Sequence, residues 1–228
     1  MPAVNDRLPR AVVFDLDGTL VDSVPDLQAA LNWLLPQHGR RDVAREEVIG
    51  MVGDGIAKLV ERAFAATGGP PDGRLEDLIG VFSDHYEAHA VRLTTPFPGA
   101  ITALAGLQDA GCRLGICTNK PEGATHEVLR ALDLACFFEA VAGGDTLPGV
   151  RKPDPAHPAH VLNLLGVEAT SAVMVGDSAN DIRSGKGAGM PTVAVTFGYA
   201  HGPVAELGAD VLIDHFDDLL EAVVQAAA

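Results

Sequence analysis

From residue 99 onward the chain alternates between short apolar runs and longer segments with the apolar spacing of helices. Apolar runs of this length, bounded by turn residues, are typical of buried strands in a parallel sheet. Strands are predicted at residues 114–117, 140–142, 172–175, 192–195 and 211–213, alternating with helices at residues 100–110, 122–132, 158–165, 179–188 and 217–226. Repeated strand–helix units predict an α/β fold, a doubly wound, Rossmann-like parallel sheet with its site at the carboxyl ends of strands.

The first apolar run, residues 11–14, lies almost a hundred residues before the next predicted strand. A parallel sheet normally reaches its next strand after one helix and a few loop residues. We therefore expect an all-helical cap domain, residues 22–95, inserted into an α/β catalytic core formed by residues 1–21 and 96–228. The two linkers of the cap should run side by side over the core, as a hinged lid requires.

The cap segment itself has helical periodicity. Helices are predicted at residues 24–38, 45–51, 56–66 and 75–91. Ser23 and Asp26, three residues apart at the first helix start, predict a capping box. The second linker, residues 94–99, is stiffened by two prolines.

Two carboxylates follow the first predicted strand directly. Asp15 and Asp17 are spaced i, i+2, and Gly18 allows the chain to turn behind them. Two such carboxylates at one sheet edge repel each other unless a cation or phosphate chemistry occupies the site. A polar turn is the simpler interpretation of an isolated pair. Here the strand, the pair and the Gly-Thr-Leu-Val-Asp-Ser continuation form one unbroken string, which favours a functional site.

Polar residues also follow two later strands and occupy one loop. Thr118 and Asp177 stand at predicted strand ends, Asp181 lies four residues further on, and Lys152 sits in a proline-rich loop. Each alone has an ordinary alternative: a helix cap for Thr118, a solvated lysine for Lys152, and a helix-dipole partner for Asp181. Together, in this order, they predict a phosphate-handling site at one edge of the sheet.

These four elements resemble the four motifs of the haloacid dehalogenase superfamily of phosphotransferases, across about residues 12–191. The resemblance implies that Asp15 is the nucleophile and Asp17 the general acid/base. It implies that Thr118, Asn119 and Lys152 bind the phosphoryl group.

The same resemblance implies Mg²⁺ as the cofactor. The ion would be held by the Asp15 carboxylate, the Asp17 main-chain carbonyl and Asp177, with Asp181 assisting from behind them. Oxygen ligands and retained waters are what Mg²⁺ prefers.

Within the superfamily the chain resembles the phosphoglycolate phosphatases. The matching stretches are residues 17–23, 52–55, 59–63, 118–121, 143–148, 152–153 and 197–199. The implied reaction is Mg²⁺-dependent hydrolysis of 2-phosphoglycolate to glycolate and phosphate through an aspartyl-phosphate. Asp54 stands where that group more often has asparagine, which leaves the specificity open.

The cap is expected to recognise the leaving group. A carboxylate substrate calls for a cation or free N–H groups, and Lys58 and Arg62 are the candidate charges, with solvated helix residues as the alternative. Competing functions are a phosphatase for a sugar phosphate or pyrophosphate, a phosphomutase, and a binding protein of the same fold without turnover.

Composition narrows the partners. The net charge is −15, from 16 basic and 31 acidic residues. This charge argues against nucleic acid and anionic membranes and for a small phosphorylated metabolite, because a phosphate backbone would be repelled over most of the surface. No signal peptide or membrane-length apolar run is visible, so a cytoplasmic enzyme, monomer or homodimer, is expected. Cys112, Cys117 and Cys136 are expected to be buried free thiols.

Two histidine pairs are not taken as metal sites. His85 and His89 are spaced i, i+4 but lack the glutamate of a zinc-protease motif. His157 and His160 are expected on a solvated helix face.

Overall fold

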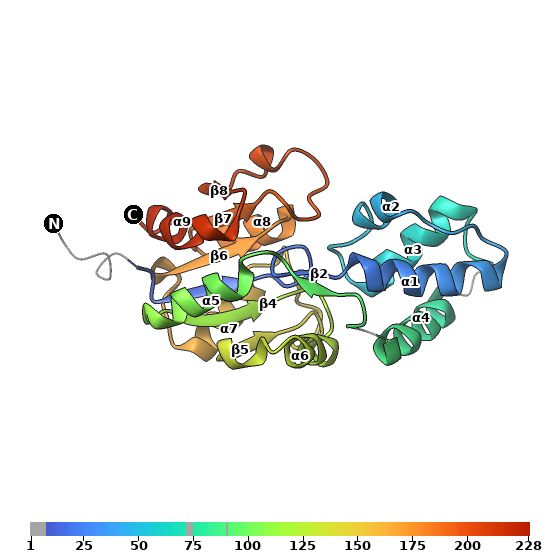
Figure 1. The fold of residues 1–228 in the computed structure, drawn as a ribbon, viewed down its shortest axis with the longest axis horizontal. Helices are drawn as coiled ribbons and strands as arrows, with labels where there is room; N and C mark the ends of the chain where they lie inside the picture. Colours follow the sequence, from blue (N-terminus) through green and yellow to red (C-terminus); the bar gives the residue numbers. More distant parts are fainter. Residues whose placement is uncertain (1–7, 72–74, 90) are drawn as a thin grey trace.

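The computed structural model describes residues 8–71, 75–89 and 91–228. Figure 1 shows an α/β part built around one sheet and, beside it, a group of four helices, with strand β2 at the junction. No helix in the described ranges is long and apolar enough to cross a membrane.

The sheet has six parallel strands in the order β5-β4-β1-β6-β7-β8. Its strands are β1 (Ala11–Phe14), β4 (Arg113–Cys117), β5 (Ala140–Ala142), β6 (Ala172–Gly176), β7 (Thr192–Val195) and β8 (Val211–Ile213). From β1 the chain builds outward through β4 and β5, then crosses back to β6 and builds the other way. The order reverses beside β1, where ligand sites of open α/β sheets form. The predicted doubly wound fold is confirmed.

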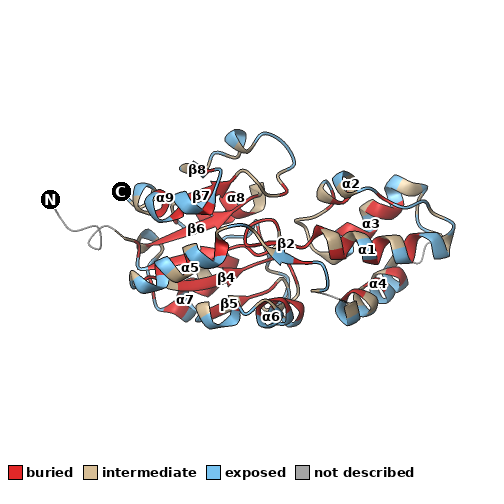
Figure 2. Ribbon diagram, in the orientation of Figure 1, coloured by how far each residue is buried: buried red, intermediate tan, exposed pale blue. Residues whose placement is uncertain are grey.

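Helices cover both faces of this sheet. They are α5 (Ala100–Asp109), α6 (Glu122–Ala131), α7 (Ala156–Leu165), α8 (Ala179–Gly187) and α9 (Leu219–Ala226). Alternate β1 side chains point to opposite faces, so Val12 and Phe14 pack in the cluster that holds α5 and α9, whereas Val13 packs with α7. Burial on both faces explains why β1 is continuously apolar. Its neighbours β4 and β6 are likewise drawn as buried in Figure 2.

Short 3₁₀ helices complete the connections. They lie at Leu35–His38, Ala135–Phe137, Ala169–Ser171, Val204–Leu207 and Phe216–Asp218. The last of these leads directly into α9.

The four remaining helices lie between β1 and β4 in sequence. They are α1 (Val24–Leu34), α2 (Arg45–Ile49), α3 (Ile56–Thr67) and α4 (Leu75–His89). They share a hydrophobic cluster of their own, in which Leu31, Phe64 and Phe82 are fully buried. Tyr199 of the α/β part also contributes to this cluster.

The chain enters and leaves this helical segment through one antiparallel pair. Strand β2 (Val21–Asp22) pairs with β3 (Thr95–Pro96), so that Asp22 lies opposite Thr95. The two linkers therefore run side by side, as expected from the sequence.

The predicted capping box at Ser23 is wrong. The Ser23 side chain makes no capping hydrogen bond, and its buried hydroxyl has no partner among the described residues. The Asp26 carboxylate instead accepts hydrogen bonds from the Leu93 N–H (3.1 Å), the Thr94 N–H (2.8 Å) and the Thr94 hydroxyl (2.6 Å). Asp26 thus ties the start of α1 to the returning linker, a use that local sequence spacing does not reveal.

Two further expectations are corrected. Cys112 and Cys117 are buried free thiols, but Cys136 is exposed, because it lies in a short surface 3₁₀ turn. His157 is fully buried rather than solvated, and a hydrogen bond joins its Nε2 to the Gly143 carbonyl. Burial, and then the nearby Lys152 charge, lower the pKa of His157 to about 4.

Replacing Asp26 by alanine should lower the free energy of unfolding by about 3 kcal/mol, because buried N–H groups lose a charged acceptor. For a chain of this length that corresponds to a fall in Tm of roughly 6–12 °C. Thermal unfolding followed by circular dichroism measures it. Asp84→Ala, at an exposed position of α4, is the matched control and should stay within about 0.5 kcal/mol. Equal Tm values for the two variants would contradict the role given to Asp26.

Candidate active site

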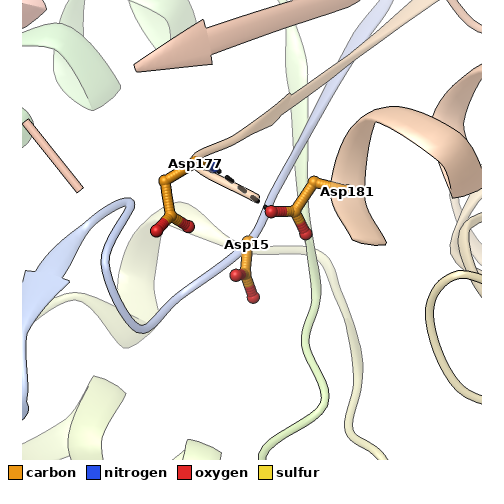
Figure 3. Close-up of side chains that lie close together, drawn as sticks. All are labelled: Asp15, Asp177 and Asp181. Atoms are coloured by element: carbon orange, nitrogen blue, oxygen red, sulfur yellow. Dashed lines mark hydrogen bonds between the residues drawn. The ribbon is translucent and has the colours of Figure 1, made fainter. Parts of the chain in front are cut away.

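Three neighbouring strands bring their polar ends to one edge of the sheet. In the register of the sheet, Phe14 of β1 pairs with Ile116 of β4 on one side and with Val175 of β6 on the other. Because the strands are parallel, Asp15, Thr118 and Asp177 emerge together just beyond those positions. Figure 3 shows the carboxyl groups of Asp15, Asp177 and Asp181 grouped at this edge.

Lys152 lies between two of these carboxylates. Its Nζ is 2.7 Å from Asp15 Oδ1 and 2.6 Å from Asp181 Oδ1, and its side chain is buried. Burial alone would lower the pKa of Lys152, but attraction to Asp15 and Asp181 outweighs burial and raises it. The loop is fixed by Asn119, whose side chain exchanges two hydrogen bonds with the Lys152 backbone, at 2.9 and 3.0 Å. The lysine is therefore a positioned cation and not a solvated one.

Opposing effects act on the pKa of the Asp15 carboxyl. Burial raises its pKa to about 7; the Lys152 ammonium lowers the pKa, and the Asp181 charge raises it. Despite the ion pair, Asp15 Oδ1 makes no hydrogen bond of acceptable geometry within the described structure. One lone pair of a buried carboxylate is thus left to interact with something else.

Asp177 is held by groups outside its own strand. Its carboxylate accepts hydrogen bonds from the Thr19 hydroxyl (3.0 Å) and the Tyr199 N–H (2.7 Å). Burial, then repulsion by Asp181 and Asp15, raise its pKa well above the ordinary value. Gly18 permits this approach: it has a φ of +87°, and a Cβ there would lie 2.5 Å from Asp177 Oδ2.

Asp181 serves two structural purposes. At the start of α8, its Oδ2 accepts hydrogen bonds from the Ser178 N–H (2.9 Å), the Ser178 hydroxyl (2.6 Å) and the Asp177 N–H (3.2 Å). Its other oxygen pairs with Lys152. The helix-start interpretation of Asp181 therefore holds alongside its place in the site.

The site has the composition of a divalent-cation site. Asp15, Asp177 and Asp181 each offer an oxygen, and the three atoms lie within 4.8 Å of one another. With Asp17, four carboxyl groups face the two ammonium groups of Lys120 and Lys152, so full ionisation would leave an excess of two negative charges. A bound divalent cation would neutralise that excess, with carboxyl oxygens of Asp15 and Asp177 as ligands. The residues present fit a metal ion.

Lys120 is a site residue to which the sequence analysis gave no role. Its buried Nζ lies 3.2 and 3.3 Å from the two Asp17 carboxylate oxygens and 2.9 Å from the Tyr86 hydroxyl of α4. The signal that pointed to it was its place in the loop after β4, two residues beyond Thr118. Tyr199 and Thr19 were missed for a different reason, because they support Asp177 from other segments.

A small cavity of about 50 Å³ lies between this edge of the sheet and the four helices. The core side of its wall includes Asp15, Asp17, Thr118, Asn119 and Lys120. The helical side is apolar and consists of Leu27, Val52, Ile56 and Leu59 with two backbone glycines, Gly53 and Gly55. A hydrogen bond from the Asn119 side-chain amide to the Gly53 carbonyl, at 3.0 Å, joins the two sides.

Lys58 and Arg62 do not line this cavity. Lys58 is exposed and pairs with Glu61, one turn further along α3, at 2.6 Å. Arg62 donates to the Met51 carbonyl at 2.8 Å and forms an ion pair with Asp54. The Asp54 carboxylate also accepts a hydrogen bond from Asn180 at 2.8 Å, so it is neutralised by Arg62 and fixed to the core.

Comparison with known proteins places these features in a family. Residues 12–195 match the haloacid dehalogenase-like hydrolase family. The chain is 42% identical over 225 residues to a phosphoglycolate phosphatase of Caulobacter vibrioides, covering 98% of this chain and 94% of that protein. It is 44% identical over 220 residues to a phosphoglycolate phosphatase of Rhodospirillum rubrum, covering 93% and 90%.

A solved structure agrees with the sequence relatives. The crystal structure of a predicted phosphoglycolate phosphatase from Haemophilus somnus superimposes with a TM-score of 0.88, at 29% identity, covering 93% of this chain and 96% of that one. The family match spans β1 to β7 and includes the ends of β1, β4 and β6, which carry the site. This chain belongs to the haloacid dehalogenase-like hydrolases.

Proposed function

We propose that this protein is a phosphatase that hydrolyses 2-phosphoglycolate to glycolate and phosphate, with Mg²⁺ as its metal ion. The observation that carries the proposal is the agreement of two facts. Relatives named for this activity align over nearly the whole chain at about 42% identity. The buried Asp15, Thr118 and Lys152 and the half-buried Asp17 lie together at one sheet edge, where the reaction needs a nucleophile, an acid and phosphate-binding groups.

In the first half-reaction Asp15 attacks the phosphorus in line. A bond forms between an Asp15 carboxylate oxygen and phosphorus, and the bond from phosphorus to the ester oxygen breaks. Asp17 donates its proton to that departing oxygen, so that glycolate leaves as the alcohol. Thr118 and Lys152 hold the non-bridging phosphoryl oxygens, with Lys152 kept in place by Asn119.

In the second half-reaction Asp17 acts as a base. It takes a proton from a water molecule that attacks the aspartyl-phosphate, and Asp15 is released as a carboxylate with inorganic phosphate as the other product. Asp15, the Asp17 main-chain carbonyl and Asp177 would hold Mg²⁺, and Asp181 supports them through Lys152 and the Asp177 N–H. The bound cation would supply charge that offsets the repulsion between the phosphate and these carboxylates.

Residues 22–95 act in this proposal as a lid on a core of residues 1–21 and 96–228. The separate hydrophobic cluster of α1–α4 and the single paired crossing at β2 and β3 support this division. A lid of this kind excludes water from the aspartyl-phosphate until the alcohol has left. The cavity beneath it is small, about 50 Å³, which supports a small leaving group such as glycolate.

A substrate panel tests the proposed function. With Mg²⁺ present, kcat/KM for 2-phosphoglycolate should exceed that for glucose 6-phosphate, ribose 5-phosphate and pyrophosphate by about 100-fold or more, because the sugar phosphates are too large for the closed lid and pyrophosphate lacks the carboxylate. EDTA should abolish turnover, and added Mg²⁺ should restore it. A sugar phosphate or pyrophosphate at the top of the ranking would replace phosphoglycolate as the substrate. Turnover that survives EDTA would remove the metal from the proposal.

A further inference from the structure

The Lys120 ammonium occupies an unusual position between the core and the helices of the lid. Its side chain is 4% exposed. It contacts Asp17 on the core side and the Tyr86 hydroxyl on the α4 side, and it lies 4.9 Å from the centre of the Tyr86 ring. An ammonium group has three N–H donors, and two of these three contacts go to the two oxygens of the same Asp17 carboxyl, so an anion beside Asp17 would share or replace one of them.

Among the described residues that line the cavity, Lys120 is the one with a positively charged side chain. Lys152 lies behind Asp15 and is shared between Asp15 and Asp181. Lys58 and Arg62 are engaged elsewhere by Glu61 and Asp54. Arg151, an exposed side chain beside Gly55, is the nearest alternative and lies outside the cavity wall.

The chemistry of the substrate matches this position. In 2-phosphoglycolate the carboxylate is attached to the carbon that carries the ester oxygen. Asp17 must reach that ester oxygen to protonate it. A cation within 3.3 Å of both Asp17 oxygens is therefore placed for an anion one carbon beyond the ester oxygen. The opposite wall carries no charged side chain: Leu27, Ile56 and Leu59 are apolar, and only backbone groups at Gly53 and Gly55 could contact an anion from that side.

We propose that Lys120 determines specificity: its ammonium binds the carboxylate of the leaving group, and Tyr86 holds it from the lid. This inference rests on the proposed function and narrows it to phosphate esters of 2-hydroxycarboxylates. Because Lys120 also contacts Asp17, the group that recognises the leaving group lies directly beside the group that protonates it. Removal of Lys120 should thus reduce all turnover somewhat and reduce turnover of the carboxylate substrate much more.

The test compares substrates that differ at the carboxylate. The Mg²⁺-loaded wild type, Lys120→Met and Lys120→Arg are assayed with 2-phosphoglycolate, its uncharged amide (2-phosphoglycolamide) and ethyl phosphate. In Lys120→Met the ratio of kcat/KM for phosphoglycolate to that for the amide should fall about tenfold or more, the scale of one charge-assisted contact. Lys120→Arg should recover part of the ratio, and Tyr86→Phe should lower it by a smaller factor in the same direction.

Inhibition by glycolate gives a readout that does not depend on phosphoglycolate turnover. With ethyl phosphate as the substrate, glycolate should inhibit the wild type, and Lys120→Met should raise its inhibition constant about tenfold. Lys186→Met, an exposed lysine paired with Asp210, is the matched control and should change neither quantity. Circular dichroism of each variant establishes that it is folded.

The outcomes separate this inference from the proposed function. If the wild type does not favour phosphoglycolate over the amide and ethyl phosphate, the proposed function and this inference fail together. If the wild type does favour phosphoglycolate and Lys120→Met lowers kcat/KM equally for all three substrates, Lys120 only positions Asp17 and the inference is overturned. A selective loss in Arg151→Met but not in Lys120→Met would also overturn it. Should Lys120→Met not fold, the Lys120→Arg and Tyr86→Phe ratios decide, and unchanged values in both would reject it.

Discussion

Asp15→Asn should reduce turnover of every phosphate ester by at least about 10⁴-fold, because an amide cannot form the acyl-phosphate. The chemistry can be followed directly. Acid-quenched wild type incubated with labelled substrate should carry the phosphoryl label, and Asp15→Asn should carry none. Asp109→Asn, an exposed position on α5, is the matched control and should retain full activity and labelling.

The same variant carries a stability signature. Burial raises the Asp15 pKa to about 7. Above pH 7 the folded protein therefore holds a buried Asp15 carboxylate, whereas in the unfolded chain water solvates that charge. A folded-state pKa above the unfolded value near 3.9 means that ionisation of Asp15 opposes folding as pH rises between these values. Without metal at pH 8, Asp15→Asn should therefore have a Tm no lower than the wild type. A lower Tm, or residual labelled protein, would contradict the role given to Asp15.

Lys152→Met should lose at least about 10³-fold in kcat and should also unfold more easily. The substitution leaves Asp15 and Asp181 buried without their shared cation, and breaking a buried pair from one side costs about 3–5 kcal/mol. In Tm this is on the order of 10 °C for a chain of this size. The deficit should grow from pH 5.5 to pH 8, because without Lys152 the buried Asp15 carboxyl favours the protonated form more strongly and its ionisation then opposes folding.

A double variant separates stability from catalysis. Lys152→Met/Asp181→Asn removes one of the stranded charges, so it should regain much of the Tm without regaining turnover. Lys186→Met on the surface should change neither the Tm nor the turnover, since exposed ion pairs contribute little to stability. Recovery of activity in the double variant would mean that Lys152 serves only to neutralise Asp181.

The sequence predicted the sheet well because its strands are short, apolar and bounded by turn residues. The predicted bounds of β5, β7 and β8 are those of the structure. Since parallel strands end at one edge, the order of the polar residues after β1, β4 and β6 also predicted that Asp15, Thr118 and Asp177 converge.

The sequence could not predict partners that come from distant segments. Asp26 looked like a capping residue because Ser23 lies three positions before it, yet its partner Thr94 is 68 residues away. His157 looked solvated because helical periodicity alone does not say which residues another loop covers. Lys58 and Arg62 were chosen for charge and spacing, but their nearest acids lie on the same segment and hold them away from the cavity.

The antiparallel pair of β2 and β3 is the point at which the helical segment could be replaced by another segment. Because Asp22 and Thr95 lie opposite each other, the 72 residues between them begin and end roughly 5 Å apart. A tight turn, or any inserted domain whose ends lie that close together, could connect β2 to β3 without altering the register of the six-stranded sheet. The lid's share in recognition of the leaving group can thus be changed by replacing one continuous piece of the gene, while Lys120 and the proposed catalytic acids stay where they are.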